Sequence, residues 1–314
     1  MNSTYSYDVA GRLTSVVHAG TGGTLQSFTY TLDAVGNRKS VISLAGTENY
    51  TLDNLNRLMN VANPNGDAIA YSYDANGNRL TKTFNSNTTN YTYDNADQLT
   101  SDGSSSYIYD ANGNLTSAGT STYMWDYANR MTGATVGGTS TSYTYDGADA
   151  RVTKTVGGST TNFVRDRQSD LPVVVDDGAK SYIQSGGLQA ELDSSAIPTY
   201  GLSDSVRSVR GLTDLAGSLV GTKDYDAFGA VRSSTGVSSP FGFTGEQSDG
   251  ETGFTYLRAR YLNPGLGRFT SADSVQPNAP GTQGYGLYTY VANNPSTWVD
   301  PSGHQIAVDI MAAN

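Results

Sequence analysis

The chain has 314 residues, of which 25 are Asp and only 4 are Glu, while 14 are Arg and 5 are Lys. Glu and Lys favour helices and are scarce, whereas Gly (36), Tyr (22), Asn, Thr and Ser favour turns and strands and are abundant, so a mainly helical protein is excluded and an all-β fold is expected. The net charge of −10, with scattered rather than clustered bases, gives no electrostatic reason to bind nucleic acid or an anionic membrane.

A motif of about twenty residues recurs along the first half of the chain. Its Asp residues are Asp8, Asp33, Asp53, Asp74, Asp94, Asp110, Asp126 and Asp146. In the fourth copy, Tyr71-Ser72-Tyr73 is typical of a strand with one aromatic face, and Asp74-Ala75-Asn76-Gly77 is typical of a type I turn that ends in a Gly with positive φ. Each copy is therefore predicted to be a hairpin. Because a lone hairpin is only marginally stable, the hairpins are expected to pair edge to edge in one continuous, coiling sheet.

The motif allows two functions other than folding, namely calcium binding by its turn and sugar binding by its Tyr residues. The pattern Asp74-x-Asn76-x-Asn78 is also found at the start of calcium loops, but an EF-hand loop has Gly at its sixth position and Glu at its twelfth, whereas here Gly77 is fourth and Asn85 is twelfth. We interpret the Asp as a hydrogen-bonding turn residue, and we predict no metal site and no cofactor. We interpret the Tyr rows as packing ladders, with sugar stacking as the alternative.

These repeats resemble the tyrosine-aspartate (YD) repeats of Rhs proteins, of the C components of insecticidal Tc toxins and of teneurins. The resemblance implies a β-sheet that spirals into a shell. From about Thr161 the short period fades, and the segments that begin at Ser203, Phe241 and Tyr285 resemble the Rhs-associated core domain, which plugs the end of such shells. We expect a YD-repeat spiral over residues 1–160, a core domain over 161–304 and a short tail over 305–314.

The resemblance to the Rhs core also implies an intramolecular aspartic protease that cuts after a DPxGL motif. Matched residue by residue, the family's Arg falls on Arg260, the Asp thirteen positions later is Asp273, and the Asp of DPxG is Asp300. The matching scissile bond joins His304 to Gln305. The resemblance assigns Asp273 as the principal acid/base, Asp300 as its partner and Arg260 as electrostatic support. Two carboxylates that share one proton can supply a base for water and an acid for the leaving amine.

Simpler interpretations stand beside these roles. Asp273 and Asp300 are both compatible with plain turn residues. Arg268 is expected to be a structural ion-pair partner, and His304 is expected to be neither a metal ligand nor a base. His304 stands where the family has Leu, and an unpaired polar side chain in an apolar pocket costs about 1 kcal/mol or more. Cleavage is therefore expected to be slow or lost.

We predict a shell of the bacterial toxin-delivery type that encapsulates or presents a C-terminal polypeptide and can cut itself after His304. It is expected to be secreted or on the cell surface, through a longer parent protein or a secretion system, because the chain shows no signal peptide and no membrane span. Its expected partners are its own C-terminal segment or a missing toxin domain, and other copies of itself through edge strands. One alternative is an extracellular structural, filament-forming or adhesive protein, which could bind glycans and would have no active protease. A third hypothesis is a solitary sugar-binding β-solenoid.

Overall fold

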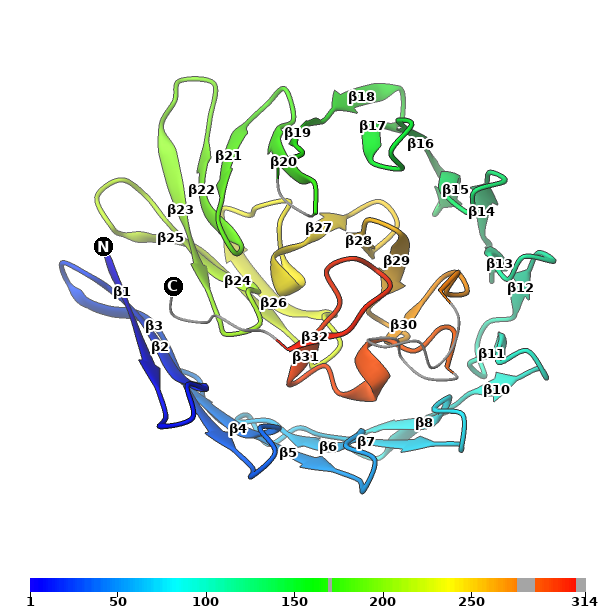
Figure 1. The fold of residues 1–314 in the computed structure, drawn as a ribbon, viewed down its shortest axis with the longest axis horizontal. Coiled ribbons are helices and arrows are strands. Elements are labelled where there is room, and N and C mark those ends of the chain that lie inside the picture. The colour runs from blue at the N-terminus through cyan, green and yellow to red at the C-terminus, as the bar shows by residue number, and fades with distance from the viewer. Residues whose placement is uncertain (169–170, 276–285, 309–314) are drawn as a thin grey trace.

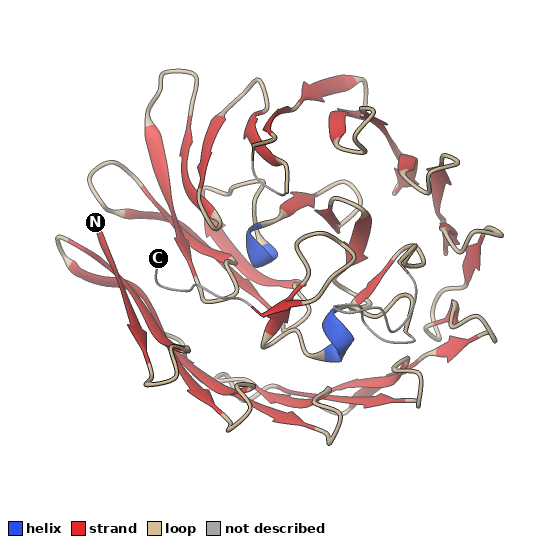
Figure 2. Cartoon of the chain, in the orientation of Figure 1, coloured by secondary structure: helices blue, strands red, loops and turns tan. Residues whose placement is uncertain are grey.

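The computed structural model describes residues 1–168, 171–275 and 286–308. Antiparallel strands wind into a ring, and the chain then turns into the middle of that ring, where a smaller sheet lies (Figure 1). The helical elements of the described ranges are two single 3-10 turns inside the ring, η1 (Phe243–Gly245) and η2 (Val291–Asn293) (Figure 2). The expected all-β fold is confirmed.

The ring begins with a nine-stranded sheet in which each strand pairs with the next one along the chain. Its strands are β1 (Asn2–Tyr7), β2 (Leu13–Gly20), β3 (Gly23–Leu32), β4 (Arg38–Ser43), β5 (Gly46–Leu52), β6 (Leu58–Ala62), β7 (Ala68–Tyr73), β8 (Arg79–Phe84) and β9 (Asn87–Asn90). A two-stranded sheet follows, made of β10 (Thr92–Tyr93) and β11 (Leu99–Ser101). The next seven strands are β12 (Tyr107–Tyr109), β13 (Leu115–Ala118), β14 (Ser121–Trp125), β15 (Met131–Val136), β16 (Thr139–Tyr145), β17 (Arg151–Val156) and β18 (Ser159–Asn162).

An eight-stranded sheet completes the ring, and the remaining strands lie inside it (Figure 1). The eight strands are β19 (Val164–Asp166), β20 (Val173–Asp176), β21 (Ser181–Gln184), β22 (Leu188–Leu192), β23 (Pro198–Ser203), β24 (Val209–Thr213), β25 (Leu219–Tyr225) and β26 (Val231–Gly236). The inner strands are β27 (Gln247–Asp249), β28 (Phe254–Leu257), β29 (Arg260–Asn263) and β30 (Arg268–Phe269), and then the pair β31 (Trp298–Val299) and β32 (Ala307–Val308).

The repeated Asp builds its turn as the sequence predicts. The Gly77 N–H donates to the Asp74 carbonyl (3.3 Å), Gly77 has a φ of +89°, and the Asn78 N–H donates to the Asp74 carboxylate (2.8 Å). The residue four positions after the Asp also binds back to the carboxylate, as Arg57 does to Asp53 (2.7 Å). Arg57 then reaches the Asp74 carbonyl (2.7 Å), so this turn is tied to the next one in the repeat. The turn interpretation is confirmed.

The aromatic faces of the hairpins point into the ring and build the core. Tyr71 packs edge-on against Phe228, with ring centroids 5.4 Å apart, and Tyr123 packs against Phe254 at the same centroid distance. Such pairs contribute about 0.5–1.5 kcal/mol beyond the burial of their area. The interpretation of the Tyr rows as packing residues is confirmed, because Tyr71 and Tyr123 are buried against a turn between two ring strands and against an inner strand, respectively.

The expectation of one continuous sheet is wrong over the described strands. The ladder breaks on both sides of the β10–β11 pair and again between β18 and β19. Near the first breaks, Asp94, Asp110 and Asp126 follow one another at intervals of sixteen residues instead of about twenty. The shorter repeat leaves two residues for β10 and three each for β11 and β12, so these strands make few ladder hydrogen bonds.

The hairpin geometry continues beyond the point where the short sequence period fades. The backbone N–H of a turn Asp donates to the carbonyl four residues later at Asp193 (3.2 Å), Asp204 (3.1 Å), Asp214 (3.0 Å) and Asp226 (2.7 Å), as it does in the first eight repeats. The ring strands therefore extend to β26. The division into a repeat region over 1–160 and a core domain over 161–304 stays a prediction.

The last ring sheet closes against the first through side chains. The His18 ring contacts the Ser203 carbonyl (Nε2 to O, 2.8 Å), and the Ser205 N–H donates to the Tyr30 hydroxyl (3.0 Å). His18 and Tyr30 belong to β2 and β3, and Ser203 ends β23, so the first and last parts of the ring lie side by side (Figure 1). Within the described ranges, the structure contains no helix that is long and apolar enough to cross a membrane.

Candidate functional site

Arg260 lies at the start of β29 and is 2% exposed. Its Nη1 donates to the Leu287 carbonyl (2.9 Å), its Nε donates to the Gly303 carbonyl, and its guanidinium lies 3.6 Å from the centroid of the Phe269 ring. The guanidinium is thus fixed on three sides by parts of the chain that are distant in sequence. Burial lowers the pKa of Arg260 to about 10, although Asp273 and Asp300 act in the opposite direction, so the group is charged at neutral pH.

Asp273 follows the inner strand β30 and is 7% exposed at its side chain. Its backbone N–H donates to the Leu287 carbonyl (3.0 Å), which is the carbonyl that also accepts from Arg260. The Asp273 carboxylate is ion-paired to Arg260, with Oδ2 and Nη2 2.8 Å apart. Its Oδ1 accepts from the Val275 N–H (3.0 Å). Asp273 is therefore held beside a buried cation.

Asp300 follows β31 and has a fully buried side chain. Its Oδ1 accepts from the Ser302 hydroxyl (3.1 Å) and from the backbone N–H groups of His304 and Gln305 (3.0 Å each). Its Oδ2 lies 3.6 Å from Arg260 Nη2. Burial raises the pKa of Asp300, and the nearby Arg260 offsets part of that rise. Asp300 is therefore a turn residue, as the simpler interpretation has it, and it also lies beside the cation.

The structure brings all five predicted site residues into one cluster, with Arg260 Nη2 close to both carboxylates. The bond between His304 and Gln305 lies against this cluster, because its N–H is the Gln305 group that donates to Asp300. Sharing of one proton between Asp273 and Asp300, and cleavage itself, stay predictions.

His304 has a contact that the sequence did not predict. Its Nδ1 lies 2.7 Å from Asp273 Oδ1, and its side chain is 28% exposed. The polar side chain is therefore paired, which removes the cost expected for an unpaired group in an apolar pocket. The two residues are 31 positions apart, and no sequence signal marked the pairing.

Arg268 does not form the expected ion pair with any residue in the described part of the chain. Its Nη2 donates to the backbone carbonyl of Asp97 (2.6 Å), and its guanidinium lies 4.8 Å and 4.9 Å from the ring centroids of Tyr93 and Tyr288. A delocalised guanidinium can stack on aromatic rings, and here it joins the ring strands to the inner strands in this way.

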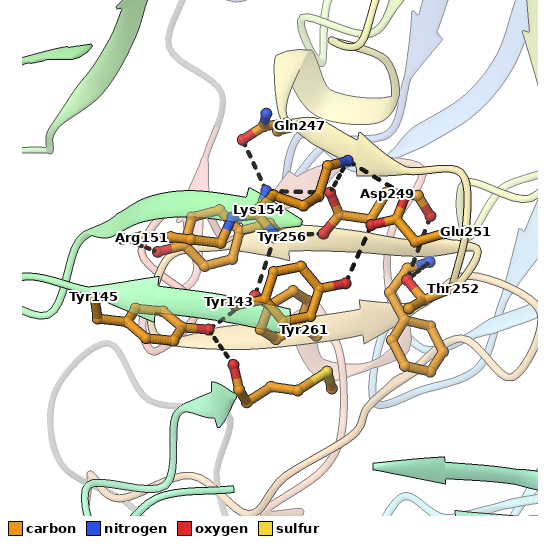
Figure 3. A network of polar contacts seen from close by, with 12 residues as sticks. Tyr143, Tyr145, Arg151, Lys154, Gln247, Asp249, Glu251, Thr252, Tyr256 and Tyr261 are labelled. Atoms are coloured by element: carbon orange, nitrogen blue, oxygen red, sulfur yellow. Dashed lines mark hydrogen bonds and ion pairs between the residues drawn. The ribbon is translucent and has the colours of Figure 1, made fainter. Parts of the chain in front are cut away.

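A second buried polar network anchors the inner sheet to the ring (Figure 3). Arg151, at the start of β17, binds Asp249 of β27 through two contacts of 2.5 Å and 3.1 Å. Both side chains are 0% exposed. Lys154 also reaches Asp249 (3.0 Å), and Arg151 donates to Gln247 (2.9 Å) and lies 4.3 Å from the Tyr256 ring centroid. Burial would lower the pKa of Arg151, but the facing Asp249 raises it well above its ordinary value. No motif in the sequence marks this pair.

A cavity of about 700 Å³ is lined by residues from β3–β8 and from β24–β26. Paired charges form part of its wall: Arg232 contacts Glu48 (2.7 Å) and Asp224 (2.9 Å), and Arg210 contacts Asp224 and Asp204 (3.0 Å to the latter). Aromatic side chains complete the wall, namely Phe28, Tyr30, Tyr50, Phe84, Tyr225 and Phe243. Among the described residues, no group of three or more His, Asp or Glu side chains is placed to hold a metal ion.

Comparison with known proteins gives a family match over most of the chain. A model described as the teneurin YD-shell matches residues 36–296. The chain is 39% identical over 106 residues to the tRNA(Glu)-specific nuclease WapA of Bacillus subtilis subsp. natto (strain BEST195). The matched region covers 31% of this chain and 4% of that relative. It is 35% identical over 106 residues to the double-stranded DNA deaminase toxin A of Burkholderia cenocepacia (strain H111). The matched region covers 32% of this chain and 7% of that relative.

Among solved structures, the crystal structure of TcdB2-TccC3 matches 96% of this chain and 18% of its own chain, with a TM-score of 0.78 and 20% sequence identity. This likeness confirms the expected YD-shell fold. The chain spans 4% and 7% of the two curated relatives and 18% of the matched structure.

Proposed function

We propose that this chain, which belongs to the teneurin YD-shell family, is a shell of the toxin-delivery type that presents a C-terminal polypeptide and releases it by cutting itself once after His304. The observation that carries the proposal is the cluster of Arg260, Asp273 and Asp300 against the His304–Gln305 bond. The nuclease and toxin names of the curated relatives support the delivery role. The inner strands fill the middle of the ring, which favours presentation over encapsulation by this chain alone (Figure 1). Secretion or display at the cell surface belongs to the same proposal.

The geometry supports different roles for the two carboxylates. Asp273 is assigned as the base, because its carboxylate is ion-paired to Arg260. Asp300 is the acid, because burial raises its pKa and its carboxyl group lies beside the Gln305 nitrogen of the bond to be cut. Arg260 keeps both groups in place and offsets their charge.

The proposed reaction is the addition of one water to the His304 carbonyl carbon. Asp273 takes a proton from the water as its oxygen bonds to that carbon. The bond between the carbon and the Gln305 nitrogen then breaks, and Asp300 gives its proton to this nitrogen. The products are a carboxyl group on His304 and an amino group on Gln305, with one water consumed, and proton exchange with solvent restores the two carboxyl groups.

The test is intact-mass spectrometry of the chain with a C-terminal tag, followed over time after purification. We expect loss of the tag at His304–Gln305 in the wild-type chain, and retention of the tag in Asp273→Asn and in Asp300→Asn. Asp97→Asn is the matched control, because Asp97 is a turn residue at the ring, and it is expected to cleave as the wild type does. Cleavage that continues in Asp273→Asn would contradict the protease assignment.

The cavity favours a second candidate function, that of an extracellular adhesive protein that binds glycans. Aromatic faces and paired charged groups are the side chains with which proteins hold sugar rings and hydroxyls, and the volume of about 700 Å³ lies within the range of ligand sites. Calorimetric titration with neutral and acidic oligosaccharides tests this function. Arg232→Ala, in the cavity wall, is expected to weaken binding about tenfold or more, whereas Arg12→Ala, in a distant turn, is not. Equal binding by the two variants would exclude the cavity as the site.

A further inference from the structure

The His304 imidazole contacts the Asp273 carboxylate, which the proposed reaction needs as its base. Its Nδ1 is 2.7 Å from Asp273 Oδ1, and the Asp273 carboxylate is the proposed base for water. His304 also contributes the carbonyl that the water would attack. One residue therefore supplies the bond to be cut and covers the base that would cut it.

We propose that His304 sets the rate of self-cleavage by masking Asp273, so that the chain stays uncut until the imidazole leaves the carboxylate. The inference rests on the proposed self-cleavage, and it goes beyond that proposal because it assigns a rate-controlling role to the side chain of the cleavage-site residue.

The acceptor positions of Asp273 show why the imidazole matters. An ionised carboxylate has about four lone-pair positions on its two oxygens. Oδ1 contacts the Val275 N–H (3.0 Å) and His304 Nδ1 (2.7 Å), and Oδ2 is ion-paired to Arg260 (2.8 Å). The Val275 N–H and the imidazole thus occupy the two positions on Oδ1. A water that is to be activated must hydrogen-bond to the base, and the imidazole competes with it for Oδ1.

The same contact argues against His304 as the base. When Asp273 is the ionised base that the proposed reaction needs, it only accepts hydrogen bonds. An Nδ1 that is 2.7 Å from it must then carry a hydrogen and cannot take a proton from water. Masking and base catalysis also predict opposite effects for the loss of the imidazole.

The imidazole can leave without movement of the cleavage segment. The His304 backbone N–H donates to Asp300 Oδ1 (3.0 Å) and to the Ser302 hydroxyl (3.1 Å), and the Gln305 N–H donates to the same two groups (3.0 Å each). These contacts hold the backbone, whereas the side chain can turn about its own torsions toward solvent, since it is 28% exposed. Release costs one charge-assisted hydrogen bond, which corresponds to about a 10- to 100-fold effect on the rate.

The test compares the rate of tag loss in the full chain with a C-terminal tag, by intact-mass spectrometry, for the wild type, His304→Leu, His304→Gln and Asp273→Asn. We expect His304→Leu to cleave about 10- to 100-fold faster than the wild type, because Leu cannot donate to Asp273. His304→Gln keeps a donor and is expected to cleave more slowly than His304→Leu. His304→Phe removes the donor with a ring of similar size and carries the same expectation if His304→Leu does not fold.

The outcomes separate the inference from the proposal on which it rests. If His304→Leu cleaves no faster than the wild type while Asp273→Asn abolishes cleavage, masking is refuted and self-cleavage stands. Equal rates for His304→Leu and His304→Gln also refute masking, because the two differ in the hydrogen bond to Asp273. If wild type and His304→Leu both stay intact, or if cleavage persists in Asp273→Asn, the proposed function fails and masking fails with it.

Discussion

The buried ion pair between Arg151 and Asp249 leads to a stability prediction that can be worked from the structure. The change is Asp249→Asn, which keeps the size of the side chain and removes its charge. Both side chains of the pair are 0% exposed, so the Arg151 guanidinium would stay buried without its counter-ion. A lost partner of this kind costs about 3–5 kcal/mol of the free energy of unfolding. Gln247 still accepts from Arg151 (2.9 Å), so we expect a value near the lower end of that range.

The matched control is Asp149→Asn. Arg130 and Asp149 form an ion pair of 2.7 Å, but Asp149 is 74% exposed, and ion pairs in solvent contribute at most about 1 kcal/mol. The assay is urea unfolding at neutral pH, followed by tyrosine fluorescence and by circular dichroism. The double variant Arg151→Met/Asp249→Leu should be more stable than Asp249→Asn, because apolar side chains leave no buried charge. Equal losses for Asp249→Asn and Asp149→Asn would refute the reasoning.

Two further predictions concern the turns. In thermal melts, Gly113→Ala should destabilise the fold by about 1 kcal/mol or more beyond the loss caused by Gly11→Ala. Both glycines have positive φ (+82° and +75°), but only at Gly113 would an added Cβ lie 2.6 Å from the Tyr288 hydroxyl. Equal losses would show that the Tyr288 contact gives way freely. Burial raises the pKa of the Asp53 and Asp126 carboxyl groups, but their hydrogen bonds to the backbone and to Arg side chains outweigh burial and lower it. The two carboxylates therefore stabilise the fold above the unfolded-state pKa of about 3.9, and this stabilisation is lost as the pH falls through the folded-state pKa values. The urea concentration at the midpoint of unfolding should therefore decrease once the pH is lowered below about 4. A midpoint concentration that is unchanged down to about pH 2 would contradict this origin of acid sensitivity.

Much of the ring could be predicted because its information is local. Each turn is specified by an Asp and by a partner four residues later, as with Asp53 and Arg57, and the alternation of Tyr with small polar residues sets which face is buried. The breaks in the sheet were missed although the sixteen-residue intervals were visible, because the number of ladder hydrogen bonds depends on how neighbouring strands align. Arg268 was misjudged because a spacing in sequence does not indicate whether a cation will meet a carboxylate or an aromatic ring.

The hairpins and the aromatic core face follow from the sequence pattern, and the YD-shell fold follows from a family resemblance that the comparisons confirm. This resemblance also named the residues of the candidate site. The folded chain alone shows that His304 pairs with Asp273, 31 positions away, and that Arg151 pairs with Asp249, 98 positions away. A turn is specified by groups a few residues apart, whereas these pairs form because the chain returns into its own ring and brings distant charged groups together in its buried interior.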